Sequence, residues 1–234
     1  MLKSAVRLVA VLSIVGSAFA AAAPRADNTL SEEEQKAGWK LLFDGKTTTG
    51  WRCWKKDKIS EGWQVIDGVL TRVKAGGDII TVDQYENFDL QVDWKIASAG
   101  NSGIMYLVQE TGHAPYETGP EYQLLDDAHH KVAPTDLTAS GACYALYPPA
   151  KAACHPVGEW NHTRILFDHR KVEHWLNGEK IVECEVGNAD WNEKVAKSKF
   201  KAWPDFAKAP KGHIDLQDHG GQVEFKNIKI RVLE

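Results

Sequence analysis

Residues 120–130, with the sequence PEYQLLDDAHH, bring carboxylates, an amide and imidazoles together in one short segment. Side chains alternate between the two faces of a strand, so the spacing predicts Glu121 and Gln123 on one face. Asp126 and His130 follow where the strand pattern stops, which predicts a place at the rim of a sheet. Groups of these types can transfer protons or bind a metal ion. A solvated strand end is the plainer alternative.

A second segment, HIDLQDHGG at residues 213–221, has the same chemical character. Period two predicts one polar face that holds His213, Asp215, Gln217 and His219, while the residues between them on the opposite face include Ile and Leu. A strand with four polar residues on one face is not expected to pack that face against a core. The two segments together therefore predict a polar, reactive sheet surface.

Neither segment has the spacing that identifies a particular metal. H-E-x-x-H and the EF-hand pattern are both absent from the sequence. A divalent ion therefore stays an open alternative, with Glu121, Asp126 and His130 as its candidate ligands, and no organic cofactor is expected. For any one histidine, a surface or hydrogen-bonded structural role is the competing interpretation.

Several other chemistries lack their motifs. The chain contains no G-x-S-x-G nucleophile elbow and no G-x-x-x-x-G-K-[ST] phosphate-binding loop. It also lacks the E-x-D-x-E strand that would place two carboxylates at the short separation required by retaining glucanases. An ordinary retaining glucanase is therefore disfavoured.

The first 20 residues have the features of a secretory signal peptide. Lys3 and Arg7 precede a short apolar run at residues 8–15, and an A-x-A site ends at Ala20. The run is shorter than the roughly 20 residues that a membrane-spanning helix needs. We therefore expect cleavage near Ala20, a secreted or periplasmic protein, and no membrane span.

The remaining chain divides into a polar lead at residues 21–37 and one domain at residues 38–234. Ser31 and Glu34 in the lead have capping-box spacing before a short helix. The net charge of −4 gives no basic patch, so nucleic acid is not an expected partner.

Nearly all of the domain has strand patterns. FDLQVDWKI at residues 88–96 alternates apolar and polar residues, and Asn177-Gly178 separates two extended runs as in a tight hairpin. Only residues 191–200, WNEKVAKSKF, predict a second short helix. Further strand candidates are GWQVIDGVLTRV, SGIMYLV, PEYQLL, ACYALY, NHTRILFD, HIDLQDH and QVEFKNIKIRVL. Many short strands without βαβ alternation predict an all-β antiparallel sandwich or jelly roll.

Four cysteines in an exported chain favour disulfides, of which three connectivities are possible. Cys143 and Cys154 bracket the loop CYALYPPAKAAC, so we favour that pair, and by elimination Cys53 with Cys184. Thiolate metal binding is the alternative, but the close C-x-x-C spacing is missing.

Tryptophan is abundant, with nine residues. We expect Trp39, Trp63 and Trp94 to fill the core, since aromatic side chains are large apolar groups. The other candidates, which could stack on a sugar ring, are Trp51, Trp54, Trp160, Trp175 and Trp203.

A series of motifs along the chain resembles the 3-keto-disaccharide hydrolase family, over about Leu41 to Leu233. The motifs are LFDGKTTTGW, GWQVIDGVL, NSGIMY, PEYQLLDD followed by His130, GACYALYPP, GEWNHTRI, VEHWLNG, VAKSKF and LQDHGGQVEFKNIKI. The resemblance implies a concanavalin-like jelly roll of two curved antiparallel sheets, with one or two short helices. It also implies cleavage of glycosides whose sugar carries a ketone at C3.

Such a ketone acidifies the proton on C2. A base can remove that proton, the C1 substituent can leave by β-elimination, and water can add to the enone to complete a net hydrolysis. The site needs a base, a proton donor to the leaving oxygen, and positive charge or donors near the enolate oxygen. A divalent ion could supply the last as a Lewis acid.

On this resemblance, Glu121 and Asp126 are candidates for base or metal ligand, and His130 and His219 for proton transfer or ligation. The expected hydrogen-bonding partners of the sugar are Gln123, Gln217 and Asp218, with Tyr144, His174 and Trp175 as secondary candidates. The expected partners are an oxidised carbohydrate substrate and a separate glycoside 3-oxidoreductase.

The competing interpretation is a non-catalytic, lectin-like carbohydrate-binding module on the same fold. A lectin surface is usually built from aromatic and amide groups. The density of carboxylates and imidazoles in PEYQLLDDAHH and LQDHG favours an enzyme instead.

Overall fold

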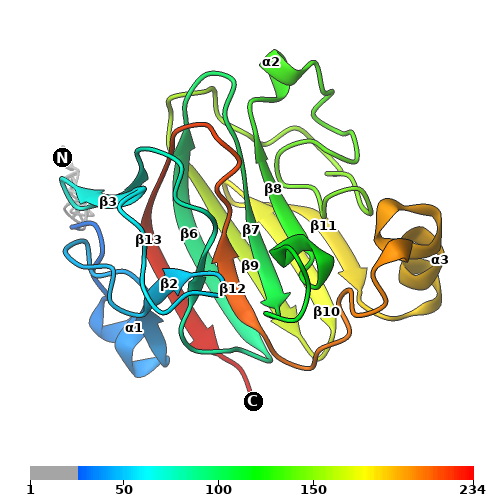
Figure 1. The fold of residues 1–234 in the computed structure, drawn as a ribbon, viewed down its shortest axis with the longest axis horizontal. Coiled ribbons are helices and arrows are strands. Elements are labelled where there is room, and N and C mark those ends of the chain that lie inside the picture. The colour runs from blue at the N-terminus through cyan, green and yellow to red at the C-terminus, as the bar shows by residue number, and fades with distance from the viewer. Residues whose placement is uncertain (1–25) are drawn as a thin grey trace, which may run out of the picture.

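The computed structural model describes residues 26–234, which form two antiparallel β-sheets packed face to face (Figure 1). The prediction of an all-β, concanavalin-like jelly roll is confirmed. The predicted signal peptide at residues 1–20, with its cleavage site, and the first part of the lead lie outside the described residues.

The larger sheet has eight strands in the order β11-β10-β9-β6-β13-β4-β3, and β1 pairs with β13 beside that path. Every pairing is antiparallel. The strands are β1 (Trp39–Leu41), β3 (Trp63–Ile66), β4 (Val69–Arg72), β6 (Phe88–Ile96), β9 (Asn161–Asp168), β10 (Lys171–Leu176), β11 (Glu179–Glu185) and β13 (Val223–Val232).

The smaller sheet has five strands in the order β2-β5-β12-β7-β8, again all antiparallel. The strands are β2 (Trp51–Cys53), β5 (Ile79–Thr81), β7 (Asn101–Val108), β8 (Glu121–Leu125) and β12 (His213–Leu216). Two of them, β8 and β12, come from the two polar segments of the sequence, so the fold brings these segments into one sheet.

The core lies between the two sheets. The apolar residues of β6 are all buried there, as the alternation in FDLQVDWKI predicts. From the smaller sheet, Tyr122 and Leu124 of β8 and Ile214 and Leu216 of β12 face the same core. Trp63 and Trp94 are core residues as predicted, whereas Trp39 is only partly buried.

The predicted hairpin joins β10 to β11. Asn177 and Gly178 both have positive φ, 51° and 84°, as a tight two-residue turn requires. Glycine adopts this conformation without strain, and Asn tolerates it better than most residues.

The described residues form three α-helices rather than the one or two predicted. In α1 (Glu32–Lys36), Ser31 and Glu34 form the predicted capping box, and α3 (Ala189–Lys197) with the 3₁₀ turn η2 (Lys199–Ala202) replaces the single helix expected at residues 191–200. The additional helix is α2 (Asp127–His130), and a further 3₁₀ turn, η1, spans Pro115–Glu117. No helix among residues 26–234 is long and apolar enough to cross a membrane.

The segment ACYALY, predicted as a strand, is a turn instead. Ala145 has a φ of 59°, and Cys143 and Tyr147 exchange both backbone hydrogen bonds, at 2.9 and 3.0 Å. The chain therefore reverses within four residues and cannot extend along a sheet.

The structure contains neither of the predicted disulfides, since Cys53, Cys143, Cys154 and Cys184 are all free. Cys154 lies exposed, whereas Cys143 is buried in the core. Cys53 lies on the smaller sheet and Cys184 on the larger one. Proximity in the sequence was therefore the wrong guide to proximity of the thiols.

Candidate active site

The outer face of the smaller sheet carries a row of side chains from neighbouring strands. Glu121 of β8 is paired with Met105 of β7. Asp215 of β12 is paired with Met105 on one side and with Ile80 of β5 on the other. Paired residues point to the same face, so the two carboxyls share one surface, two strands apart.

Gly103 of β7 makes room for the Glu121 carboxyl. A Cβ atom added to Gly103 would lie 2.3 Å from Glu121 Oε1, so the carboxyl lies directly over the bare glycine backbone. Gln123 of β8 is paired with Gly103, and Gln217 donates its N–H to the Gly103 carbonyl at 3.0 Å. In the amide orientation that satisfies both acceptors, Gln123 Nε2 donates to Ser102 O and to Glu121 Oε1, each at 3.1 Å.

Glu121 has the environment of a proton-transfer group. Its side chain is largely removed from water, with 7% of the residue exposed, and burial raises its pKa to about 8. The positive charge of Lys199 lowers this pKa, and the negative charge of Asp78 raises it further. A carboxyl with this pKa exists in both protonation states near neutral pH, which suits a general base or acid.

Asp215 is fully buried and has no hydrogen-bond partner for either carboxyl oxygen within residues 26–234. Burial raises its pKa well above the ordinary value, and the charges of Asp78 and Glu121 add to the increase. The Gln217 Oε1 atom, just beyond the same strand, is likewise unpaired within these residues. Buried polar atoms without partners are rare in folded proteins, so they indicate a surface that binds a polar ligand.

Asp78 precedes β5 and belongs to the same surface. Burial raises its pKa to about 6, although its Oδ1 accepts a hydrogen bond from the Asp218 N–H at 2.8 Å. The negative charge of Asp218 adds to the increase. Asp78, Glu121 and Asp215 therefore form an acidic cluster in which full ionisation is unfavourable.

Lys199, the first residue of η2, is the cation whose charge acts on Glu121. Its ammonium lies 4.5 Å from the ring centre of Tyr144 and 5.4 Å from that of Tyr116. No hydrogen bond or ion pair to another residue of the described chain occupies it. Partial burial lowers its pKa, although the charge of Glu121 acts in the opposite direction.

The environments of Glu121 and Lys199 bring their pKa values closer together. Burial raises the pKa of the acid and lowers that of the amine. A carboxyl with a raised pKa and an ammonium with a lowered pKa are suited to accept and to donate protons in acid–base catalysis.

Tyr144 is close to the same carboxyl. Its N–H donates to the Glu121 carbonyl at 2.9 Å, and burial raises the pKa of its hydroxyl, with the charge of Glu121 adding to the increase. Four predicted site residues, Glu121, Gln123, Gln217 and Tyr144, are thus brought together.

Asp126 and His130 lie away from this surface because β8 ends at Leu125 and the chain turns into α2. Asp126 caps that helix: its Oδ1 accepts from the His129 N–H at 3.1 Å and its Oδ2 from the Ala99 N–H at 2.9 Å. His130 is exposed, with Nε2 3.3 Å from the Ala99 carbonyl oxygen. Both side chains are engaged with backbone groups at the rim.

Asp218 and His219 follow β12 beyond its last strand residue. The Asp218 carboxylate accepts from Arg72 Nε at 2.7 Å and from the N–H groups of Gly76 and Gly77 at 2.7 and 2.9 Å. It therefore fastens the loop before β5 to the end of β12. His219 is exposed next to it.

His174 and Trp175 belong to β10 of the larger sheet. His174 is fully buried between the sheets, with its ring nitrogens 3.0 Å from Gly141 O and 3.2 Å from the Tyr106 hydroxyl. Burial lowers its pKa to about 4, although the bond to Gly141 opposes the decrease. The Trp175 indole donates to Glu173 at 2.8 Å on the opposite face of β10. Neither side chain reaches the surface that holds Glu121.

The predicted metal ligands do not converge. Glu121 lies over Gly103, while Asp126 and His130 are bonded to the backbone beside α2. Within residues 26–234, no group of three or more His, Cys, Asp or Glu side chains is arranged to hold a metal ion. These residues therefore do not fit a shared ion.

Three residues of the site were not selected from the sequence. Asp215 belongs to the predicted polar face of residues 213–219, so its position on that face was a usable signal. Asp78 lies directly before β5, and Lys199 is the first residue of η2. At such positions the alternation of side chains does not predict which sheet residues will lie nearby. Only the fold brings them to Glu121.

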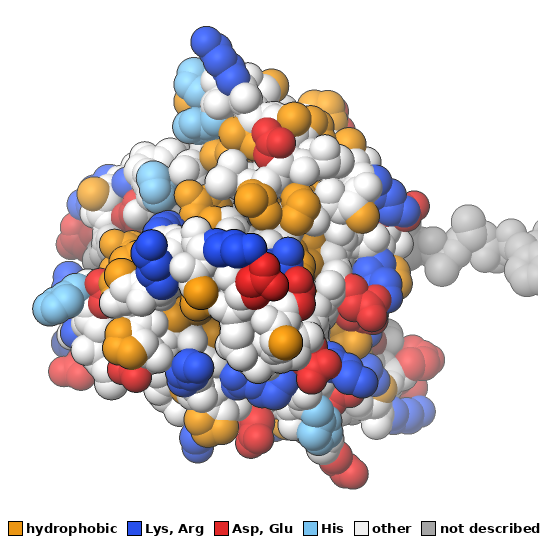
Figure 2. All heavy atoms as spheres, turned by 90° about the vertical axis from the view of Figure 1, so that its right-hand side faces the viewer, with side chains coloured by type: hydrophobic (Ala, Val, Ile, Leu, Met, Phe, Trp, Pro, Cys, Tyr) orange, Lys and Arg blue, Asp and Glu red, His pale blue; other side chains and the backbone are white. Residues whose placement is uncertain are grey.

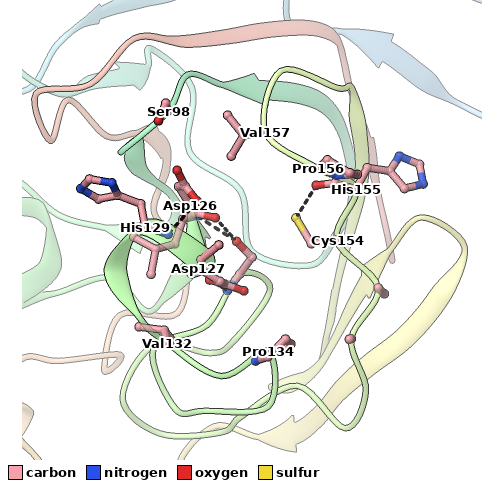
Figure 3. Close-up of a pocket in the computed structure, with 15 residues that line it drawn as sticks. Ser98, Asp126, Asp127, His129, Val132, Pro134, Cys154, His155, Pro156 and Val157 are labelled. Carbon is pink, nitrogen blue, oxygen red and sulfur yellow. Dashed lines mark hydrogen bonds between the residues drawn. The ribbon is translucent and has the colours of Figure 1, made fainter.

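A cavity of about 890 Å³ lies beside α2 and is a different feature (Figure 3). Its wall includes Asp126, Asp127 and Cys154. Both carboxylates are bonded to backbone N–H groups, Asp127 through the Ser140 N–H at 3.0 Å. The two acidic residues of this cavity therefore have a structural role, because their carboxylates already bind the backbone around it.

The face of the molecule that carries α3 intersperses basic and acidic side chains (Figure 2). This mixture agrees with the small net charge of −4.

The arrangement on the smaller sheet can be compared with known proteins. Residues 38–231 match the model of the family described as the 3-keto-alpha-glucoside-1,2-lyase-like domain. The chain belongs to this family. It is 32% identical over 229 residues to a 3-keto-disaccharide hydrolase of Bacteroides thetaiotaomicron, a match that covers 84% of this chain and 79% of that protein.

Crystal structures from Parabacteroides distasonis agree with the family assignment. One, provisionally called a glycosyl hydrolase, has a TM-score of 0.82 and 43% identity, covering 89% of this chain and all of the other. A second, with the same provisional description, has a TM-score of 0.66 and 31% identity, covering 83% of this chain and 99% of the other. Family and relatives support a glycoside hydrolase-like function.

Proposed function

We propose that the protein cleaves 3-keto-glycosides, including 3-keto-disaccharides, on the outer face of the smaller sheet. The observation that carries the proposal is the buried Glu121 carboxyl over Gly103, whose pKa burial raises to about 8 and on which the charge of Lys199 acts. The family of the chain supplies the substrate class.

The first half-reaction is elimination. The Glu121 carboxylate takes the proton from C2, which the C3 ketone acidifies, and the electron pair forms the C1–C2 double bond. The C1–O bond breaks, and the Lys199 ammonium gives a proton to the leaving oxygen. Before Lys199 donates this proton, its positive charge also stabilises the negative charge that develops on the sugar.

The second half-reaction is hydration. Neutral Lys199 takes a proton from water as the hydroxide adds to C1, and protonated Glu121 returns its proton to C2. Both residues regain their starting protonation states, so the net reaction consumes one water and releases an alcohol and a 3-keto sugar.

The remaining polar groups are proposed to bind the sugar. Asp215, whose pKa burial raises well above its ordinary value, can donate a hydrogen bond in its protonated form, and Gln217 Oε1 can accept one. Gln123 holds the Glu121 carboxyl in place through its amide. A separate oxidoreductase that converts a C3 hydroxyl into a ketone would have to supply the substrate.

Ionisable groups also separate this proposal from a lectin-like module. Three carboxyls and an ammonium with shifted pKa values share one surface, and shifted values of this kind concentrate at catalytic sites. A lectin needs no group poised to exchange protons.

The test is incubation with a chemically 3-oxidised disaccharide and, in parallel, with the unmodified disaccharide. We expect release of the 3-keto monosaccharide from the first alone, unchanged by a chelator. Binding of the unmodified sugar without any cleavage of the oxidised one would support the lectin instead.

A further inference from the structure

Tyr116 is the one exposed aromatic side chain in residues 26–234. Its exposed fraction is 36%, whereas the other aromatic residues of this range are buried or half-buried. It lies in η1, within the connection from β7 to β8 at residues 109–120. A single exposed apolar side chain is common in folded proteins, so its neighbours decide whether it has a role.

Several contacts fasten this connection to the rest of the molecule. At its start, Arg52 of β2 donates two hydrogen bonds to the Glu110 carboxylate, at 2.7 and 2.8 Å. At its end, the Thr118 carbonyl accepts a hydrogen bond from the Ala207 N–H at 2.8 Å. The Tyr116 ring is therefore carried by a segment that is already held in place, so a ligand that contacts the ring does not have to order the chain first.

Tyr116 lies close to the proposed proton donor. The Lys199 ammonium is 5.4 Å from the centre of the Tyr116 ring. Two further rings surround this ammonium, Tyr144 at 4.5 Å and Phe200 at 5.4 Å. Phe200 is buried, and Tyr144 is half-buried with its N–H bonded to the Glu121 carbonyl at 2.9 Å. Of the three rings, Tyr116 is therefore the one most open to a bound ligand.

Trp203 holds the Tyr116 ring from another direction. The two ring centres are 5.4 Å apart and the ring planes meet at 63°, which is an edge-on contact. Trp203 directly follows η2, packs against the core and is half-buried. Such a contact helps to fix the orientation of a ring, and the Tyr116 side chain still reaches solvent.

We propose that Tyr116 binds the leaving-group sugar of a 3-keto-disaccharide. This inference rests on the proposed function, in which Lys199 protonates the leaving oxygen. An oxygen at hydrogen-bond distance from the ammonium, about 3 Å, places the attached sugar beside a ring whose centre is 5.4 Å from the same nitrogen. The C–H groups on one face of a pyranose are apolar and can pack against an aromatic ring.

The contact would determine specificity. A leaving group as small as methanol is too short to cover the ring, whereas a pyranose can bury part of it. Binding energy from a part of the substrate that does not react can raise kcat/KM for the larger substrate. Tyr116 does not touch the reacting atoms, so it is a specificity-determining residue and not a catalytic one.

The test compares two substrates that share the same 3-keto sugar, a 3-oxidised glucose disaccharide and methyl 3-ketoglucoside. In Tyr116→Ala, kcat/KM should fall about 10-fold for the disaccharide and stay within about twofold of the wild type for the methyl glycoside. Tyr116→Phe keeps the ring and should keep both values. The matched control is Val232→Ala, which removes an exposed apolar side chain from the larger sheet. Equal losses on both substrates, or no loss on the disaccharide, would overturn the proposal.

A second measurement does not depend on turnover. Glucose is the leaving group of such a disaccharide, and saturation-transfer NMR detects its contact with the protein. We expect transfer to glucose from the wild type and from Tyr116→Phe, and its loss in Tyr116→Ala. No transfer in the wild type, or equal transfer in Tyr116→Ala, would overturn the assignment of Tyr116. If the wild type cleaves neither oxidised substrate, the proposed function fails, and the glucose experiment still decides whether Tyr116 contacts a sugar.

Discussion

Glu121 combines the two properties that a catalytic base at neutral pH requires. Its carboxyl lies in a site prepared by Gly103, and its pKa of about 8 reflects burial, opposed by Lys199 and reinforced by Asp78. Fully solvated glutamate would be ionised at neutral pH but would bind a proton only weakly. The raised pKa makes the ionised carboxylate a stronger base.

The pH dependence of the reaction should follow this residue. Only ionised Glu121 accepts the C2 proton, so kcat/KM should rise as the pH rises through about 8. It should fall again at higher pH as Lys199 loses its proton, giving a bell-shaped profile. Initial rates on a 3-oxidised disaccharide across this range provide the measurement.

Removal of the Lys199 charge should change that profile. In Lys199→Met, no positive charge lowers the pKa of Glu121, so the rising limb of the profile should move to higher pH. Because the proton donor is also lost, turnover should fall by about 10²–10⁴-fold. Lys201→Met is the matched control in the same turn and should behave like the wild type. An unchanged limb in Lys199→Met would remove Lys199 from the mechanism.

Replacement of the base itself should nearly abolish turnover. Glu121→Gln keeps the shape of the side chain but cannot accept a proton, so we expect turnover to fall by about 10²–10⁴-fold. The exposed Glu61→Gln is the control, because Glu61 pairs only with Lys74 at the surface. Near-normal turnover in Glu121→Gln, with the fold intact, would show that another group is the base.

The same substitution should stabilise the protein at alkaline pH. The folded pKa of Glu121 is raised from 4.5 to about 8, so its stability contribution is complete below pH 4.5 and is lost as the pH rises toward 8. The loss is roughly 1.4 kcal/mol per pH unit for a single group between its two pKa values. Gln cannot ionise, so the melting temperature of Glu121→Gln should exceed that of the wild type at pH 8. Equal differences at pH 5 and pH 8 would contradict the shifted pKa.

Among the elements, β7 is important because Gly103 has no side chain, which leaves space for the Glu121 carboxyl. In Gly103→Ala, the Cβ atom would collide with Glu121 Oε1, and the carboxyl would have to move. A displacement of about 1 Å can slow a reaction roughly 100-fold, so we expect turnover to fall by about one to two orders of magnitude. In a Glu121→Gln background, the same change should produce no further loss, which the double-mutant comparison measures.

Asp126 lies in a segment rich in candidate catalytic residues, but its carboxylate has a structural role as the cap of α2. Asp126→Ala removes the cap bonds to His129 and Ala99 and should cost about 1 kcal/mol in the free energy of unfolding. Turnover should stay within about twofold of the wild type. A collapse of turnover comparable with that of Glu121→Gln would instead assign Asp126 to the reaction.

On the scale of the whole molecule, one face of the smaller sheet packs into the core and the other face holds the proposed site. Tyr122, Leu124, Ile214 and Leu216 point into the core, while their neighbours on β8 and β12 point to the site. Substitutions in the site should therefore leave the packing between the sheets intact. This is why variants of Glu121 can test the chemistry without unfolding the protein.

The sequence by itself determined the all-β class, the hairpin at Asn177-Gly178 and the polar face of residues 213–217. These properties depend on alternation and on local backbone preference, which a short segment already contains. The motif resemblance to the 3-keto-disaccharide hydrolase family indicated the reaction class, and the family match agrees with it. Glu121, Gln123 and Gln217 could be selected because period two assigns them to a face.

Only the tertiary structure decided which groups meet. The charges of Lys199 and Asp78 act on Glu121 from segments far away in the chain, and Cys143 is buried in the core whereas Cys154 is exposed. The pKa of Glu121 also depends on burial, which is a property of the packed molecule. Local periodicity specifies the face of a strand, whereas distance and desolvation arise only after the sheets have packed together.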